Sequence, residues 1–249
     1  MRAHLSRSRA IVLAVVIAVL LIGAFAAFRI SRALCFQLIG HPICHVETRE
    51  KLVALTFDDG PTPEGVTRIL DALRPYDAHA TFFLIGREVA KHPGEVRRLL
   101  AAGQEVGNHS YSHTRMWGLF AAPYVDEIRR TDTLLRAQGA APVFFRPPYG
   151  KKLTGLPLAV ERTGYRMVTW DVADPDEATD AKGYADRVLA QVKPGSIILI
   201  HAMYPSRRIA RAALPLILAG LHDRGYHAVS VGELVRHGAA GLAKRPDGD

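Results

Sequence analysis

Runs of apolar residues divide the chain into one long segment and several short ones, and the two kinds predict different elements. Residues 10–28 form an uninterrupted apolar run, about as long as the ~20-residue helix that crosses a bilayer. Farther along, short runs rich in Val, Ile, Phe and Thr, most of them bounded by Gly or Pro, predict strands. These runs are residues 52–57, 80–85, 105–108, 143–146, 166–171, 196–201 and 227–231.

Between the short runs, apolar residues recur every three or four positions, which is the spacing of an amphipathic helix. The spacing is clearest in residues 65–73, and residues 95–102, 123–138 and 208–222 repeat it. Strands that alternate with helices indicate βα units and a mainly parallel sheet. We therefore predict an α/β fold, a distorted (β/α) barrel of about seven parallel strands with an N-terminal transmembrane helix. In such barrels the functional residues follow the carboxyl ends of the strands.

The charges that flank the long apolar run predict its orientation. Arg2, Arg7 and Arg9 precede it, and the more basic flank of a membrane helix stays in the cytoplasm. The rest of the chain is therefore expected on the outer side of the cell membrane, held by a single-pass anchor. The sequence AFA at 24–26 also matches the small-residue site of a cleaved signal peptide, which would make the protein secreted. We favour the anchor because the run is long for a signal peptide.

The net charge of +8 suggests an acidic partner until its distribution is considered. Residues 1–46 contain five Arg and no acid, so the remainder carries only 8 − 5 = +3, with its cations scattered among acids. Because no basic block contains interleaved aromatic residues, we expect no nucleic-acid partner.

Two cysteines, Cys35 and Cys44, follow the apolar run closely. In an oxidising compartment they can close a small disulfide loop, and two unpaired thiols fit the sequence equally well. Two thiolates without a Cys-x-x-Cys spacing do not indicate a zinc site.

Adjacent carboxylates, Asp58 and Asp59, end the first predicted strand and are followed by Gly60 and Pro61. Two such groups at the end of an apolar strand repel one another unless a cation lies nearby. Neighbouring side chains of an extended chain point to opposite sides, so one carboxylate can bind a metal while the other faces substrate or water. A simple turn before Gly-Pro is the alternative interpretation.

Two histidines, His109 and His113, follow the third predicted strand at a spacing of four. This spacing places them on one face of a helical turn, where they can bind one ion. With Asp59 they form a set of three ligands that leaves coordination positions open, as in a catalytic metal site. Imidazole and carboxylate ligands suit zinc, cobalt, manganese, nickel or iron, and of these we expect zinc.

Two further strand ends carry polar residues. The fourth predicted strand leads into Arg146, two prolines and Tyr149. An arginine can hold a carboxylate through a fork of donors, and the prolines stiffen the turn so that a backbone N–H near Tyr149 keeps a fixed direction. The sixth strand ends in His201, and histidine is the natural general acid near neutral pH.

Four of these strand ends, in this order, resemble the polysaccharide deacetylases of carbohydrate esterase family 4, which share the NodB-homology domain. The matching motifs are TFDDGP at 56–61, HSYSH at 109–113, RPPY at 146–149 and LIH at 199–201. The resemblance extends over about residues 50–235 and implies the barrel fold that the apolar pattern predicts independently.

The resemblance implies a metal-dependent hydrolase that removes acetyl groups, N-acetyl and possibly O-acetyl, from a cell-surface or cell-wall polysaccharide. It implies attack by a metal-bound water, with Asp58 as general base and His201 as general acid. Arg146 would orient the base, and Tyr149 would offer its backbone N–H to the oxyanion. The implied metal ligands are Asp59, His109 and His113.

One motif departs from the family pattern. The family usually has D-x-x-D-W, in which the second Asp orients the acid histidine. Here Asp176 falls at that position, while Ala173 replaces the first Asp and Glu177 replaces the Trp. Asp171 and Asp174 are alternative partners for the histidine. The missing Trp removes an apolar wall that the family's acetyl pocket usually has.

The sequence thus predicts five regions along the chain. They are a cytoplasmic flank at 1–9, the anchor or signal peptide at 10–28, a juxtamembrane connector at 29–50, a NodB-homology catalytic domain at 51–236 and a polar tail at 237–249. The expected partners are the membrane, through the N-terminal helix, and an acetylated glycan such as peptidoglycan, chitooligosaccharide or exopolysaccharide. A hydrolase of a small amide and a non-catalytic glycan-binding homologue are the alternatives.

Overall fold

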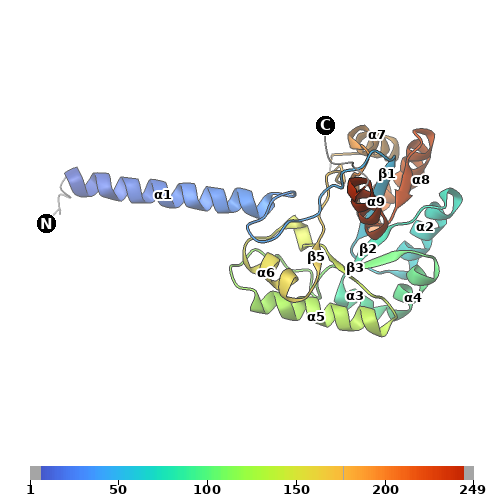
Figure 1. Ribbon diagram of the computed structural model, residues 1–249, viewed down its shortest axis with the longest axis horizontal. Coiled ribbons are helices and arrows are strands. Elements are labelled where there is room, and N and C mark those ends of the chain that lie inside the picture. Colours follow the sequence, from blue (N-terminus) through green and yellow to red (C-terminus); the bar gives the residue numbers. More distant parts are fainter. Residues whose placement is uncertain (1–6, 176, 244–249) are drawn as a thin grey trace.

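A long helix projects from a rounded α/β domain in the computed structural model, which describes residues 7–175 and 177–243 (Figure 1). Helix α1, Arg7–Arg32, contains a stretch of 24 residues, Arg9–Arg32, that is long and apolar enough to cross a membrane. Its most apolar part is not buried inside the protein, whereas Ser31 in its last turn is buried. The helix extends beyond the predicted apolar run at both ends, and Arg29 and Arg32 lie in its last turn, where cations suit the helix dipole.

Seven parallel strands form one sheet in the order β5-β4-β3-β2-β1-β6, with β7 beside β1. Their bounds are β1 Leu52–Asp58, β2 Thr81–Leu84, β3 Glu105–Asn108, β4 Phe144–Phe145, β5 Arg166–Met167, β6 Ile197–Ile200 and β7 His227–Val229. Every residue of β1 is buried, because β6 pairs along one edge while β2 and β7 share the other. The prediction of about seven parallel strands is confirmed.

The sheet curls into a distorted barrel at its two edges. After β5 the chain continues as single bridges, Val168 with Ile43 and Val172 with Ile198 of β6. Five of the predicted strands are longer than the observed ones, and two of them shorten by half or more. Residues 143–146 shorten to β4, because Arg146 is followed by two prolines, and 166–171 shorten to β5 plus these bridges.

Helices cover the sheet between the strands. They are α2 Pro63–Leu73, α3 Gly86–Lys91, α4 Pro93–Ala101, α5 Ala122–Ala137, α6 Gly155–Arg162, α7 Ala181–Gln191, α8 Arg208–Asp223 and α9 Val231–Ala243. Helix α2 begins where Thr62 accepts a hydrogen bond from the Gly65 N–H, and it buries Val66, Ile69 and Leu73 against the sheet. The apolar spacing predicted α2, α4, α5 and α8 and missed the other four.

The segment between α1 and β1 packs against the domain. Cys35 and Cys44 form a disulfide, with 5.3 Å between their Cα atoms, which decides between the two possibilities that the sequence left open. The Thr169 hydroxyl donates to the Leu34 carbonyl over 2.7 Å, and the Lys152 N–H donates to the Ser31 carbonyl over 3.1 Å. Burial lowers the pKa of Lys152 to about 8. Hydrogen bonds thus hold the end of α1 and the segment that follows it against the domain.

Candidate metal centre

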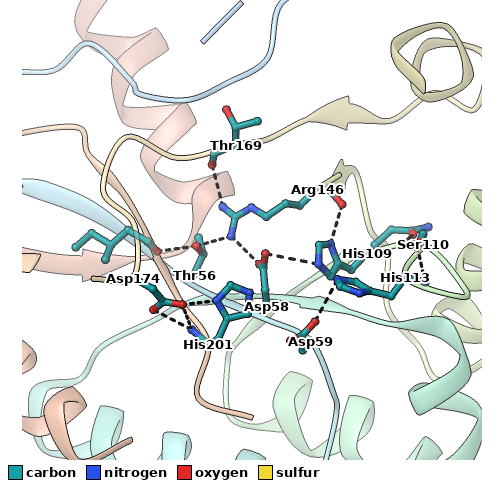
Figure 2. A network of polar contacts seen from close by, with 12 residues as sticks. Thr56, Asp58, Asp59, His109, Ser110, His113, Arg146, Thr169, Asp174 and His201 are labelled. Atoms are coloured by element: carbon teal, nitrogen blue, oxygen red, sulfur yellow. Dashed lines mark hydrogen bonds and ion pairs between the residues drawn. The ribbon is translucent and has the colours of Figure 1, made fainter. Parts of the chain in front are cut away.

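Four parallel strands end at one place, and each delivers a polar residue there (Figure 2). Asp58 is the last residue of β1, His109 follows β3, Arg146 follows β4 and His201 follows β6. Because parallel strands share the direction of their carboxyl ends, residues far apart in sequence converge on this edge. The expectation that the polar residues cluster at the strand ends is met.

Three side chains offer ligand atoms that all lie within 4.8 Å of one another: Asp59, His109 and His113. The His113 Nε2 is 3.4 Å from the Asp59 Oδ1, and the His109 Nε2 is 3.6 Å from the Asp58 Oδ2. Asp59 has a φ of 76°, so the chain leaves the extended conformation at once and both carboxylates reach the same site. The expectation that Asp58 and Asp59 point to opposite sides assumed an extended chain. The turn at Asp59 brings both carboxylates to the histidines instead.

The two histidines do not lie on a helical turn, and that part of the prediction is wrong. Residues 109–113 form a loop in which Ser110 and His113 have positive φ angles of 64° and 57°. Helix α5 holds this loop, because one oxygen of Glu127 accepts hydrogen bonds from the N–H groups of residues 111 and 112, over 3.0 and 2.8 Å. The ring centroids of His109 and His113 are 4.8 Å apart.

The chemistry of this set suits a divalent metal ion. The Nδ1–H of His109 donates to the Arg146 carbonyl over 2.7 Å, which leaves the Nε2 lone pair available as a ligand. Burial lowers the pKa of His109 and of His113, so both favour the neutral form that binds metals. The Asp59 Oδ1 is buried and has no hydrogen-bond partner among the described residues. A cation at this position would satisfy that oxygen.

Asp58 is held by a buried arginine. The Arg146 Nη1 donates to the Asp58 Oδ1 and to the Thr56 hydroxyl oxygen, both over 2.7 Å, and its Nη2 donates to the Thr169 carbonyl over 2.9 Å. The guanidinium also lies 4.2 Å from the centroid of the Phe83 ring. Burial alone raises the pKa of Asp58, but the charge of Arg146, aided by neighbouring histidines, outweighs it and brings the pKa below its usual value.

His201 has a carboxylate partner of its own. Its Nδ1 contacts the Asp174 Oδ2, and its backbone N–H lies 3.2 Å from both oxygens of the same carboxylate. Burial lowers the pKa of His201, but the hydrogen bond to Asp174 and the charge of Asp58 more than compensate, and the net shift is upward. The Tyr184 hydroxyl donates to Asp174 and helps to hold it in place.

The three candidate acids of the divergent motif have different outcomes. Asp174, an alternative in the sequence analysis, contacts His201. Asp171 instead accepts hydrogen bonds from the Ile197 N–H and the Ser196 hydroxyl, and its Oδ2 lies 2.9 Å from the His45 Nδ1. Asp176, the predicted orienting residue, lies outside the described residues.

Tyr149 lies at the open side of the centre. Its φ of 58° and ψ of 13° fix a left-handed turn after the two prolines, and its side chain is half exposed. The ring centroid is 4.8 Å from that of His113 and 4.7 Å from the guanidinium carbon of Arg115. On the opposite flank, a cavity of 260 Å³ adjoins His201 and is also lined by Arg207 and Arg208.

Sequence reasoning missed three supporting residues. Thr56 lies two positions before Asp58 and therefore on the same face of β1, which is a signal that could have identified it. Thr169 acts through its backbone carbonyl, and Glu127 lies 16 residues beyond Tyr111, whose N–H it accepts. The sequence contains no local sign of either contact.

Comparisons with known proteins agree with the geometry. A family profile described as polysaccharide deacetylase matches residues 45–168. The peptidoglycan-N-acetylmuramic acid deacetylase PdaC of Bacillus subtilis is 38% identical over 192 residues, which are 76% of this chain and 40% of that protein. A peptidoglycan-N-acetylglucosamine deacetylase of Bacillus cereus is 35% identical over 206 residues, which are 80% of this chain and 94% of the relative.

Solved structures have the same fold. The structure of PdaC from Bacillus subtilis superposes with a TM-score of 0.72 at 36% identity, covering 80% of this chain and 96% of the solved one. BA3943 from Bacillus anthracis, described as a CE4 family pseudoenzyme, also gives a TM-score of 0.72, at 28% identity, covering 79% of this chain and 69% of its own. The likeness therefore includes both an enzyme and a protein described as a pseudoenzyme.

Proposed function

The chain belongs to the polysaccharide deacetylases of carbohydrate esterase family 4, and on that premise we propose that it hydrolyses acetyl groups of a cell-wall glycan in a metal-dependent reaction. The observation that carries the proposal is the convergence of a buried carboxylate, a histidine–carboxylate pair and three metal-ligand side chains at one edge of the sheet. In a metal-assisted hydrolysis of an amide, these parts can serve as base, acid and metal ligands.

The proposed base is Asp58. Its lowered pKa keeps it a carboxylate at neutral pH, and Arg146 fixes one of its oxygens while the other faces His109. Asp58 accepts a proton from the attacking water, whose oxygen bonds to the carbonyl carbon of the acetyl group. When bound by Asp59, His109 and His113, a divalent ion, most simply zinc, polarises the carbonyl and lowers the pKa of water.

The proposed acid is His201. An amide does not expel an unprotonated nitrogen, so a proton has to reach the nitrogen as the C–N bond breaks. The raised pKa of His201 favours the protonated ring, and Asp174 fixes the ring by its contact with Nδ1. The other ring nitrogen, Nε2, then gives its proton to the departing amine. The products are acetate and the free amino sugar.

The oxyanion is assigned to the turn after β4. The Tyr149 N–H is carried by a backbone that two prolines and a left-handed conformation hold in one direction. A preorganised donor of this kind typically contributes about 3–4 kcal/mol to the stability of the transition state. Arg146 serves the same reaction indirectly, as a positioning residue for Asp58.

We place the substrate in the bacterial cell wall because the two relatives named above are peptidoglycan deacetylases. The chain spans only 40% of the first of them, so the preference between muramic acid and glucosamine residues is not transferred. Helix α1 supports a location at the membrane, with the basic N-terminal flank inside the cell and the catalytic domain outside.

The proposal is tested by measuring acetate release from peptidoglycan and from acetylated chitooligosaccharides. The full-length protein in detergent is stripped with a chelator and assayed before and after addition of zinc, cobalt or manganese. We expect no release without metal and restored release with it. The Arg187→Met variant, which loses an exposed ion pair on α7, is treated in the same way and controls for damage by the chelation and re-addition of metal. Metal-bound protein that releases acetate from neither glycan would contradict the proposal and favour a non-catalytic member like BA3943.

A further inference from the structure

One loop next to the metal centre exposes large apolar side chains. In residues 114–121, between His113 and α5, Met116 is fully buried, whereas Trp117, Leu119 and Phe120 are 57%, 60% and 80% exposed. The loop is not loose, since the Gly118 N–H donates to the Tyr124 hydroxyl oxygen over 2.7 Å. A held loop that presents three large apolar side chains to solvent usually has a partner.

This loop is tied to the end of the membrane helix through a short segment, residues 151–155. At one end of the segment, Lys152 binds the carbonyls of Ser31 and Ala33 with its backbone and side-chain nitrogens. At the other end, the Thr154 hydroxyl and the Gly155 N–H donate to the carbonyls of residues 119 and 118, over 3.2 and 3.1 Å. Helix α6 and the end of α1 accordingly lie on one side of the domain (Figure 1).

The disulfide loop adds apolar surface at the same end of α1. Phe36 and Leu38 lie four and six residues after the end of α1, inside the disulfide loop, and are 53% and 51% exposed. A helix of ~20 apolar residues that spans a bilayer ends at the headgroup level, so residues attached to its last turn lie at that level too. Aromatic side chains are enriched there.

Three cations belong to the same segments: Arg115 lies in the loop, Lys151 in the segment tied to it, and Arg32 in the last turn of α1. Burial lowers the pKa of Lys151, and the charges of Arg32 and Arg115 lower it further, which shows that the three cations are close to one another. None of the three forms an ion pair with any residue that the structure describes. Unpaired cations beside exposed apolar groups are the combination that binds an anionic lipid surface.

We propose that the loop at 114–121 and the neighbouring cations form an interfacial surface that binds the outer leaflet of an anionic bilayer. Trp117, Leu119 and Phe120 enter the headgroup region, while Arg115 and Lys151 contact lipid phosphates. The inference rests on the proposed anchoring by α1. Leu119 favours lipid over a sugar as the partner, because a sugar ring stacks on aromatic faces and gains little from an aliphatic side chain.

The surface has a consequence for the substrate. Arg115 lies over the ring of Tyr149, and that ring packs against His113, so one side chain, that of Tyr149, lies between the proposed bilayer contact and a candidate metal ligand. A loop immersed in the headgroups would keep the mouth of the site within a short distance of the membrane. The glycan acetyl groups within reach are then those closest to the bilayer.

Trp117 makes the surface measurable, because the chain has only two tryptophans. The full-length protein is reconstituted in vesicles of phosphatidylcholine with phosphatidylglycerol, with or without bromine on the acyl chains. We expect bromine to quench the emission of the unaltered protein and to quench it much less in Trp117→Phe, in which only the half-buried Trp170 remains. Quenching by aqueous iodide should follow the reverse order.

The role of the cations is tested in the same vesicles. Each cation at an anionic surface strengthens binding about fivefold. Arg115→Gln combined with Lys151→Gln should therefore reduce the bromine quenching, as should replacement of phosphatidylglycerol by phosphatidylcholine alone. Equal quenching in these conditions would remove the cations from the proposal.

Separate measurements distinguish failure of the membrane anchor, failure of catalysis and failure of the proposed surface. Resistance to alkaline carbonate reports insertion of α1, and acetate release in detergent reports catalysis. An inserted, active protein whose Trp117 is quenched by iodide and untouched by bromine would overturn the surface alone. If added glycan then protected Trp117 from iodide, the loop would be a sugar-binding platform instead.

Discussion

Asp58 lies between two groups of residues that differ in burial. On one side are Thr56, Arg146 and Thr169, all fully buried, where Arg146 donates three hydrogen bonds of 2.7–2.9 Å to Thr56, Asp58 and Thr169. On the other side are His201 and Asp174, whose side chains are 23% and 13% exposed. We call these the arginine side and the histidine side.

The difference follows from what each side has to do. Arg146, as a proposed positioning residue, can be fully enclosed, and its hydrogen bonds through Nη1 and Nη2 fix the carboxylate that it holds. His201, as the proposed acid, would exchange a proton with a substrate and would therefore have to remain accessible. The residues that hold Asp58 in place and the residue proposed to exchange a proton thus lie on opposite sides of the Asp58 carboxylate.

The largest expected effect comes from the carboxylate between the two sides. Asp58→Asn keeps the shape and an oxygen for Arg146 but removes the base, so kcat for acetate release should fall about 10²–10⁴-fold. Metal affinity should change little, since Asp59, His109 and His113 remain. The measurement is a comparison of kcat with metal content in the purified variant. Retained turnover at full metal content would exclude Asp58 as the base.

The arginine side is tested through stability. Arg146→Met leaves the Asp58 carboxylate buried without its partner, which typically costs about 3–5 kcal/mol in the free energy of unfolding. In the unaltered protein the pKa of Asp58 is lowered, so the pair stabilises the fold above the unfolded-state value near ~3.9 and this contribution is lost as the pH falls below it.

The same variant reverses the sign of that pH dependence. Without Arg146, burial is the dominant influence and the pKa of Asp58 rises, so the deficit should grow as the pH increases from about 4 toward 8. Chemical denaturation of metal-free protein at several pH values measures it. Arg187→Met, at an exposed pair, should leave the midpoint unchanged. A deficit independent of pH would mean that lost packing, and not the charge of Asp58, is responsible.

The histidine side is tested with two neighbouring acids. Asp174→Asn removes the charge that raises the pKa of His201, so the alkaline limb of the kcat profile, where the acid loses its proton, should move to lower pH. A loss of roughly tenfold or more in kcat should accompany it, as part of the ~10²–10⁴-fold that acid–base catalysis supplies. Asp171→Asn, which alters the partner of His45, should leave the limb in place. The opposite pattern would transfer the role to Asp171.

The smallest effect is expected at the support of the metal ligands. Glu127→Gln weakens the two hydrogen bonds that hold the loop between His109 and His113, and loss of such outer contacts typically lowers metal affinity by about tenfold. Competition with a chromophoric chelator measures the affinity. Asp126→Asn, at an exposed position one residue earlier on α5, is the matched control. Equal affinities in the two variants would show that the loop needs no such support.

The two sides also differ in how far the sequence predicted them. Short apolar runs located the strand ends, so Asp58, His109, Arg146 and His201 could be expected at one edge of the sheet. Strand pairing is a regular consequence of apolar pattern and chain direction, and it carries these residues with it.

The rest depends on contacts that have no local signature. The loop at 109–113 was predicted as a helical turn from its spacing alone, but two positive φ angles and the distant Glu127 determine its shape. Which acidic residue contacts His201 depends on the path of the irregular segment after β5. Counting residues from a motif does not predict where each side chain of such a segment lies. Asp174 and Asp171 bind different partners only because that segment bridges to β6.

Thr169 has a consequence for anyone who wishes to make this protein without helix α1. Its hydroxyl donates to Leu34 and its carbonyl accepts from Arg146, so a single residue joins the segment after α1 to the back of the metal centre. A version shortened to begin at residue 46 would lose Leu34, the disulfide and the Ile43 bridge together. A version without the exposed apolar part of α1 should therefore start ahead of Ser31, with the cut placed inside that helix.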